Sequence, residues 1–189
     1  VYAAGLRVPF VGIKTLVLGG RNVTAFAGIN GPYLTDTNKD GYITERDVVV
    51  DGKTYLADTL NKSAIGFAIN NLDFGLVIAN PQVMGQAADA VTFIGVTASA
   101  DYAGLVGTSP WVTLNARDVR FGLNMAIANG YPLPLTYVDF SSIDDGGARG
   151  MDIPIGTQKT INMAELDAFE IRIGMQANLG LFDLFTINA

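Results

Sequence analysis

The sequence predicts an all-β protein, either an antiparallel β-sandwich or an elongated stacked β-sheet, with long amphipathic strands and at most one or two short helical turns. Stretches in which apolar and polar residues alternate recur about every ten to fifteen residues. The 22 glycines stand among β-branched and aromatic residues, and pairs such as Asn-Gly and Asp-Gly separate the alternating stretches. No linker rich in Pro, Ser and Gly interrupts this pattern, so residues 1–189 are expected to form a single module.

The first hairpin is predicted at residues 48–56. Three consecutive valines precede Asp51-Gly52, and Lys-Thr-Tyr-Leu follows it. An Asp-Gly pair between two β-prone runs is typical of a tight two-residue turn.

Residues 65–69 and 72–78 have strand patterns of opposite parity. Because side chains alternate between the two faces of a strand, this change requires a bulge or a turn at Asn70-Asn71.

Further strands are predicted in the second half of the chain, at residues 91–102, 111–119 and 119–127. Residues 169–181 alternate strictly from Phe169 to Leu181, which predicts a half-buried strand of unusual length, bent or bulged at its glycines. Helical signals are limited to residues 44–49, after Thr44, and to residues 162–169, where Asn162 is a candidate N-cap.

The composition excludes several classes of function. The net charge of −6 and the lack of a basic patch argue against nucleic acid or an anionic membrane as a partner. Histidine and cysteine are both absent, which excludes histidine-based triads, thiol nucleophiles and the usual zinc sites. Neighbouring carboxylates such as Asp144-Asp145 lie in turns and do not suggest a catalytic pair, so no enzyme is expected. No 18-residue apolar run predicts a membrane span.

Residues 36–47 have the spacing of a twelve-position calcium loop. Side-chain oxygens recur at positions 1, 3 and 5, and a glycine stands at position 6, where the chain needs a left-handed turn. Position 7 offers a backbone carbonyl, and positions 9 and 12 offer further oxygens. The expected Ca²⁺ ligands are Asp36, Asn38, Asp40, the Tyr42 carbonyl, Thr44 and Asp47.

This stretch resembles EF-hand loops, and more closely the dockerin type, which has Asp at position 12. The resemblance covers twelve residues and implies the ligand roles just given. The flanking sequence departs from that pattern, because Asn30-Gly31-Pro32 precedes the loop and the predicted hairpin follows it. A calcium switch requires a pair of helices that reorient, so we expect a structural clamp instead.

A second acidic turn contains Asp144, Asp145 and Asp152. These three carboxylates are a candidate for a second calcium site, but their spacing matches no recognised loop. A glycine-rich β-turn is the favoured interpretation.

Most of the chain also resembles repeat units of very large bacterial surface or secreted proteins. The resemblance lies in the order of phrases such as "NLDFGLVI", "VTASADYAGLVG" and "VTLNARDVRFGLNMA". It implies a secreted or cell-surface, non-enzymatic, adhesin- or filament-like protein built of repeats.

The expected function is therefore an extracellular, calcium-stabilised structural module that assembles with copies of itself or with neighbouring repeats into a stalk, surface layer or filament. Long amphipathic strands with open edges favour such assembly, since a partner would cover them. The alternative is a calcium-dependent carbohydrate- or protein-binding module of a secreted protein. That function would need an exposed aromatic platform, for which Trp111 is the candidate.

Overall fold

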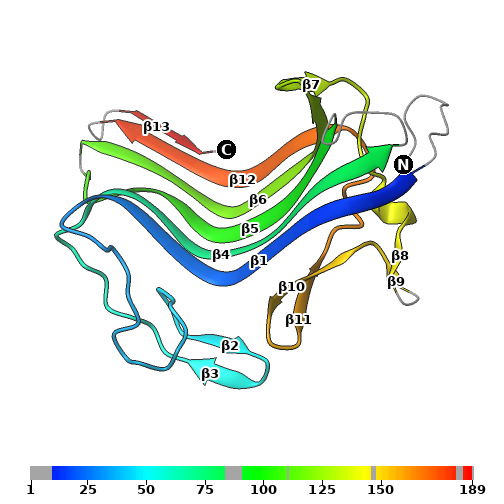
Figure 1. Ribbon diagram of the computed structural model, residues 1–189. Coiled ribbons are helices and arrows are strands. Elements are labelled where there is room, and N and C mark those ends of the chain that lie inside the picture. The colour runs from blue at the N-terminus through cyan, green and yellow to red at the C-terminus, as the bar shows by residue number, and fades with distance from the viewer. Residues whose placement is uncertain (1–9, 84–90, 110, 146–147, 182–184, 189) are drawn as a thin grey trace. The chain divides into compact units, whose positions relative to one another are not determined.

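The computed structural model describes residues 10–83, 91–109, 111–145, 148–181 and 185–188, and it is all-β as predicted (Figure 1). Thirteen strands and one 3₁₀ turn, η1, are present in these ranges. Their bounds are β1 Phe10–Ile29, β2 Val48–Val50, β3 Lys53–Tyr55, β4 Ile65–Val83, β5 Thr92–Val106, β6 Val112–Ala128, β7 Tyr131–Leu133, η1 Phe140–Ser142, β8 Asp144–Asp145, β9 Ala148–Arg149, β10 Asp152–Gly156, β11 Lys159–Asn162, β12 Glu170–Leu181 and β13 Phe185–Asn188.

One sheet contains all the long strands, in the order β1-β4-β5-β6-β12-β13, with β7 paired to β6. Three two-stranded sheets, β2–β3, β8–β9 and β10–β11, lie outside it. Each long strand joins segments that the sequence pattern predicts separately: 65–69 and 72–78 belong to β4, and 111–119 and 119–127 belong to β6. The predicted irregularity in β4 falls at Asn71, which has a φ of 52° within an unbroken strand.

Contacts divide the chain into two compact units. The first draws on residues 10–20, 74–98 and 121–173, and the second on residues 21–73, 99–120 and 174–188. Each unit contains portions of the long strands together with one covering segment that lies outside the large sheet.

In the first unit, the covering segment contains η1, β10 and β11. Its core consists of Val77, Phe140, Ile153, Met163 and Leu166. Small residues of the sheet allow the close approach of this segment: a Cβ at Gly95 would lie 2.7 Å from the Phe140 ring.

The second unit has a smaller core. Ala68, Tyr102 and Val106 are buried there, with Phe26 and Tyr33 packed against them. Its covering segment is residues 30–64, which include the candidate calcium loop and the β2–β3 hairpin.

Two expectations about strands and turns need correction. The strand predicted at 169–181 forms as β12, but its apolar side chains are exposed rather than half-buried: Ile171 is 63% and Ile173 60% exposed. Nothing in the described chain covers this side of β12. No helical turn forms at 44–49, because Thr44 is bonded to the distant Asp58 and Val48 already pairs with Tyr55.

Residues 162–169 also form turns rather than a helix. Asn162 nevertheless acts as a local cap, since its Oδ1 accepts the Ala164 N–H at 2.8 Å.

Candidate calcium loop and the adjoining polar cavity

The hairpin behind the loop forms as predicted. Val48 pairs with Tyr55 and Val50 with Lys53, while Asp51 and Gly52 both have positive φ, as a two-residue turn of type I′ requires. The Tyr42 and Tyr55 rings lie 4.7 Å apart, and Lys53 Nζ lies 4.3 Å from the centre of the Tyr55 ring. The hairpin therefore packs back onto the loop that precedes it.

Two of the expected ligands, Asp36 and Asn38, converge within the loop. The Asp40 N–H lies 3.1 Å from Asp36 Oδ1 and 2.9 Å from Asn38 Oδ1, so both oxygens face the same point. Asp36 Oδ2 accepts the N–H of Gly41 at 2.9 Å. Gly41 has a φ of 85°, the left-handed conformation expected at position 6. The local fold thus matches the first half of a calcium loop.

Residues 56–58, which follow the hairpin, run beside the loop and bind its polar side chains. Asp40 Oδ2 accepts the N–H of Leu56 at 2.9 Å, and Asn38 Nδ2 donates to the Leu56 carbonyl at 2.8 Å. Asp47 Oδ1 accepts the N–H of Ala57 at 2.8 Å. Because a carboxylate has about four lone-pair positions, these bonds leave acceptor sites on Asp40 and Asp47.

Asp58 belongs to the candidate site, and the motif does not reveal it. It is 6% exposed, and its carboxylate accepts the N–H groups of Thr37 at 2.7 Å and Thr44 at 3.1 Å. The Thr37 hydroxyl also donates to it, at 3.1 Å. Asp58 therefore ties positions 2 and 9 of the loop to one buried charge. The only sign in the sequence is a lone Asp just after the hairpin.

The expected ligand Thr44 is held differently. Thr44 is 6% exposed, and its hydroxyl donates to the Arg46 carbonyl at 2.8 Å. Within the described ranges, no three Asp or Glu carboxylates gather at metal-binding spacing. A loop of this type also uses amide, hydroxyl and backbone carbonyl oxygens, which that finding does not include. The donor chemistry of Asp36, Asn38 and Asp40 fits Ca²⁺.

The second acidic turn provides no further evidence for a metal site. Asp144 and Asp145 form β8, and their side chains lie outside what the structure describes. Asp152 Oδ1 accepts the amide of Asn162 at 2.7 Å, within the β10–β11 hairpin. Asp152 therefore has a structural partner.

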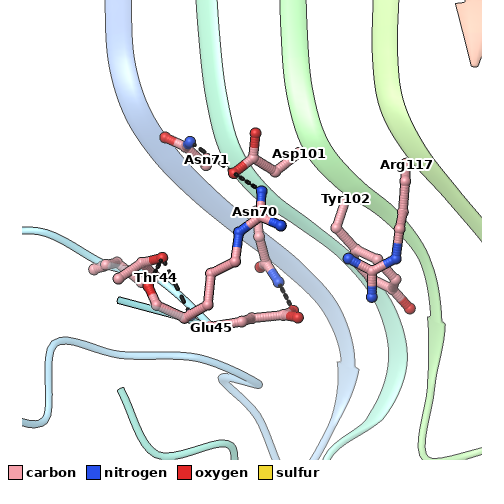
Figure 2. A pocket seen from close by; sticks show the side chains of 9 residues that line it. Thr44, Glu45, Asn70, Asn71, Asp101, Tyr102 and Arg117 are labelled. Atoms are coloured by element: carbon pink, nitrogen blue, oxygen red, sulfur yellow. Dashed lines mark hydrogen bonds and ion pairs between the residues drawn. The ribbon is translucent and has the colours of Figure 1, made fainter. Parts of the chain in front are cut away.

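A polar cavity adjoins the loop at Thr44 (Figure 2). Its volume is about 230 Å³, and all of its lining residues belong to the second unit. The side chains that matter here are Glu45, Arg46, Asn70, Asp101, Tyr102 and Arg117. The covering segment contributes the first two, and β4, β5 and β6 contribute the others.

One wall of the cavity is built by hydrogen bonds across the strands. Asn22 Nδ2 donates to Asn71 Oδ1 at 3.0 Å, and Asn71 Nδ2 donates to Asp101 Oδ2 at 3.0 Å. Arg46 lies 3.9 Å from the same Asp101 oxygen. Asn22 and Asn71 both have positive φ. Two irregular positions in the strands therefore supply the side chains of this hydrogen-bonded row.

Tyr102 lines the cavity with an uncharged phenol. Its hydroxyl donates to the Leu105 carbonyl at 3.2 Å, and the Arg117 guanidinium lies 5.8 Å from the centre of its ring. Burial is the main reason that the pKa of Tyr102 is raised to about 12; Tyr33 and Glu45 act in the same direction, and Arg117 opposes them. The phenol therefore carries no charge at neutral pH.

Trp111, the candidate platform, lies apart from this cavity. It is 66% exposed and is not among the residues that line the cavity.

No family model, curated protein or solved structure matches this chain. Among the described residues, no helix is long and apolar enough to cross a membrane.

Proposed function

We propose that the chain is an extracellular, non-enzymatic structural module, stabilised by calcium, that assembles with copies of itself into a stalk, surface layer or filament. The exposed apolar side of β12, on an outer part of the sheet, is the observation that carries this proposal. Neighbouring repeats of the same kind would serve equally as partners if the chain is part of a longer protein.

The edge of β12 is open along most of its length. β13 pairs with β12 only from Asn178 to Leu181. Before Asn178, β6 is the one strand that pairs with β12 in the described chain. The free backbone groups of such an edge are a template for another strand.

Side chains on β12 add an apolar surface to this edge. Ile171, Ile173, Met175, Leu179 and Leu181 alternate along the strand and are 40–63% exposed. Burying them against a second copy would remove apolar surface from water, which stabilises association by roughly 25 cal/mol for each Å² buried.

The other outer strand, β1, has a matching character. It pairs only with β4 among the described strands, and Ile13, Leu16 and Leu18 are about half exposed. Joining β1 of one copy to β12 of the next is a head-to-tail contact, which continues into an open assembly unless a rotation closes it.

Calcium would act on the covering segment of the second unit. Asp36 and Asp40 are two carboxylates within one short loop, and a divalent cation between them would relieve their repulsion. Because the loop is bonded to residues 56–58, an ion bound there would also hold the hairpin in place. Extracellular calcium is abundant enough to fill a weak site of this kind.

Assembly is tested with the purified full chain in calcium and in chelator, by negative-stain microscopy and sedimentation. We expect filaments or large oligomers in calcium that disappear on chelation. Ile173→Lys, on the exposed side of β12, should abolish them, whereas Val49→Lys, at a 70% exposed position on β2, should not. A monomer that is indifferent to calcium overturns the proposal.

Calcium binding is tested separately by isothermal titration. Asp36→Asn removes one ligand charge and should weaken binding about tenfold or more, the effect of losing a charged interaction of about 1.4 kcal/mol. Asp118→Asn is the matched control, because Asp118 lies on β6 outside the loop. Equal affinities of these two variants for calcium would remove the loop from the proposal.

The alternative function, a calcium-dependent carbohydrate- or protein-binding module, is favoured by one observation: the indole of Trp111 is exposed on the surface. Exposed tryptophan is enriched at binding surfaces. Trp111→Ala should abolish ligand binding if this function is correct, and should leave self-assembly intact if the structural function is correct.

A further inference from the structure

The cavity beside Thr44 contains a buried hydrogen-bond acceptor that has no partner. Asn70 is 3% exposed, and its Oδ1 has no partner in the described chain. Its Nδ2 donates to Glu45 Oε1 at 2.5 Å, and Figure 2 shows the amide directed toward Glu45. Reversing the amide would place oxygen against the carboxylate, so this bond fixes its orientation. A buried polar atom without a partner is costly and points to a group that binds there.

The charges around the cavity balance. Glu45 and Asp101 supply two carboxylates, while Arg46 and Arg117 supply two guanidinium groups. An anionic ligand would face the carboxylates, and a cationic ligand would face the guanidinium groups. A neutral ligand meets neither repulsion.

Arg117, on β6, supplies donors to the same cavity. It stacks over Tyr102, and none of the described carboxylates lies within ion-pair distance of it. The cavity thus presents a buried acceptor without a partner in the described chain, Asn70 Oδ1, and the N–H groups of the exposed Arg117, which can donate to a ligand. A hydroxyl-bearing ligand can donate to the first and accept from the second.

The size of the cavity limits the ligand. Its volume of about 230 Å³ is smaller than the pockets of roughly 300–1,000 Å³ that take drug-sized molecules. One ring fits this space better than an oligomer does.

We propose that this cavity binds one neutral sugar unit, a hexose-sized ring whose hydroxyl groups donate to Asn70 Oδ1 and accept from Arg117. This inference rests on neither self-assembly nor the Trp111 platform. A ring at the end of, or within, a glycan chain is recognised by the same hydroxyl chemistry.

The experiment is saturation-transfer NMR on the full chain in calcium, with D-glucose, D-galactose and D-mannose as separate probes. Glucuronate and glucosamine serve as the anionic and cationic counterparts of glucose. We expect at least one neutral hexose to bind and both charged sugars to bind more weakly than that hexose. Binding of none of the three hexoses, or tighter binding of a charged sugar, overturns the proposal.

Variants locate the binding. Asn70→Leu has a similar volume but no acceptor, and should weaken binding about tenfold, the loss of one well-made hydrogen bond. Arg117→Met removes the donors at an exposed position, keeps an apolar side chain over Tyr102, and should have a similar effect. Trp111→Ala is the control and should bind normally. Binding that survives both cavity variants, or that is lost in Trp111→Ala alone, contradicts the assignment of the site.

Discussion

Asp58 and Thr44 are joined by two hydrogen bonds in opposite directions. The Thr44 N–H donates to Asp58 Oδ2 at 3.1 Å, and the Asp58 N–H donates to the Thr44 carbonyl at 2.8 Å. Both residues are buried, at 6% exposure each. Thr44 ends the central part of the candidate calcium loop and also lines the polar cavity. This pair therefore links the loop, the segment after the hairpin and the cavity wall.

Replacing Asp58 should destabilise the loop strongly. Asp58→Asn keeps one acceptor oxygen but replaces the other with an amide that faces an N–H donor. We expect the free energy of unfolding to fall by about 2–3 kcal/mol, the range for a lost hydrogen bond to a charged group. Urea denaturation measures this. The same substitution at Asp118, on the exposed surface of β6, should change stability by less than about 0.5 kcal/mol; equal losses would refute the anchoring role of Asp58.

Position 41 requires glycine because of its backbone conformation, and not because a larger side chain would lack space. Its φ is 85°, and a Cβ there would meet no atom within 4 Å. Gly41→Ala should therefore cost about 1–2 kcal/mol, the cost of a left-handed conformation for a residue with a Cβ. At Gly174, on β12, a Cβ would also meet open space, but φ is not positive. Gly174→Ala should be neutral or slightly stabilising in the same denaturation experiment.

The features that the sequence predicts well depend on neighbouring residues. Asp51-Gly52 produces the predicted hairpin because both positions take positive φ, which the flanking β-prone runs do not oppose. The irregularity at Asn71 follows from the parity change alone. In the loop, the side-chain oxygens of Asp36 and Asn38 meet at the Asp40 N–H through local bonds, which their spacing favours.

The features that the sequence does not reveal depend on distant contacts. Asp58 lies 22 residues beyond Asp36, and no motif connects its position to the loop. The alternation of apolar and polar residues in β12 shows that the strand has an apolar side. It does not show whether another part of the chain covers that side. In the second half of β6, the small residues Gly122, Asn124 and Ala126 are the buried ones, because a covering segment can approach them closely. Alternation by itself would favour burial of the larger Phe121 and Leu123.

Tyr102 makes stability depend on alkaline pH. Its pKa is raised to about 12, mainly by burial, from an ordinary value of 10.0. The unfolded chain therefore loses this proton before the folded chain does. The stabilisation from Tyr102 is complete below pH 10 and is lost as the pH rises toward 12, by about 2–3 kcal/mol in total.

The variant Tyr102→Phe tests this dependence. It should be less stable than wild type near pH 8 by about 1 kcal/mol, the value of the hydroxyl hydrogen bond to Leu105. Between pH 10 and 12 the free energy of unfolding of the variant should fall less steeply than that of the wild type. The difference in stability between the two proteins should therefore narrow or reverse. Burial also raises the pKa of Tyr33 and Tyr42, so some alkaline dependence should remain. A wild-type profile that is parallel to that of the variant would contradict the role of Tyr102.

Asn124 connects the sheet of the first unit to its covering segment. It is 1% exposed, and its Nδ2 donates to the carbonyls of Val138 at 2.8 Å and Leu166 at 3.0 Å. The Leu166 carbonyl also accepts the Phe140 N–H, so it keeps a partner when Asn124 is replaced. The Val138 carbonyl is therefore the one that relies on Asn124. The Asn124 Oδ1 also accepts the Val138 N–H at 3.4 Å, so Asn124→Ala removes three hydrogen bonds and leaves a buried carbonyl without its partner. It should lower the free energy of unfolding by about 2–4 kcal/mol. Asn115→Ala, on the same strand but less buried, is the control.

The variant Asn124→Asp separates loss of packing from loss of donors. It preserves the shape of the side chain but places an acceptor against two carbonyl oxygens, so at neutral pH it should be less stable than Asn124→Ala. A protonated carboxyl can donate one of the two lost bonds, and burial among carbonyls favours that neutral form. The pKa of this carboxyl in the folded state is therefore raised. The free energy of unfolding of the Asn124→Asp variant should increase as the pH falls and decrease as the pH rises. On acidification, the free energy of unfolding of Asn124→Asp could instead fall in parallel with that of the wild type. That result would show that the two hydrogen bonds donated by Asn124 do not hold the covering segment to β6.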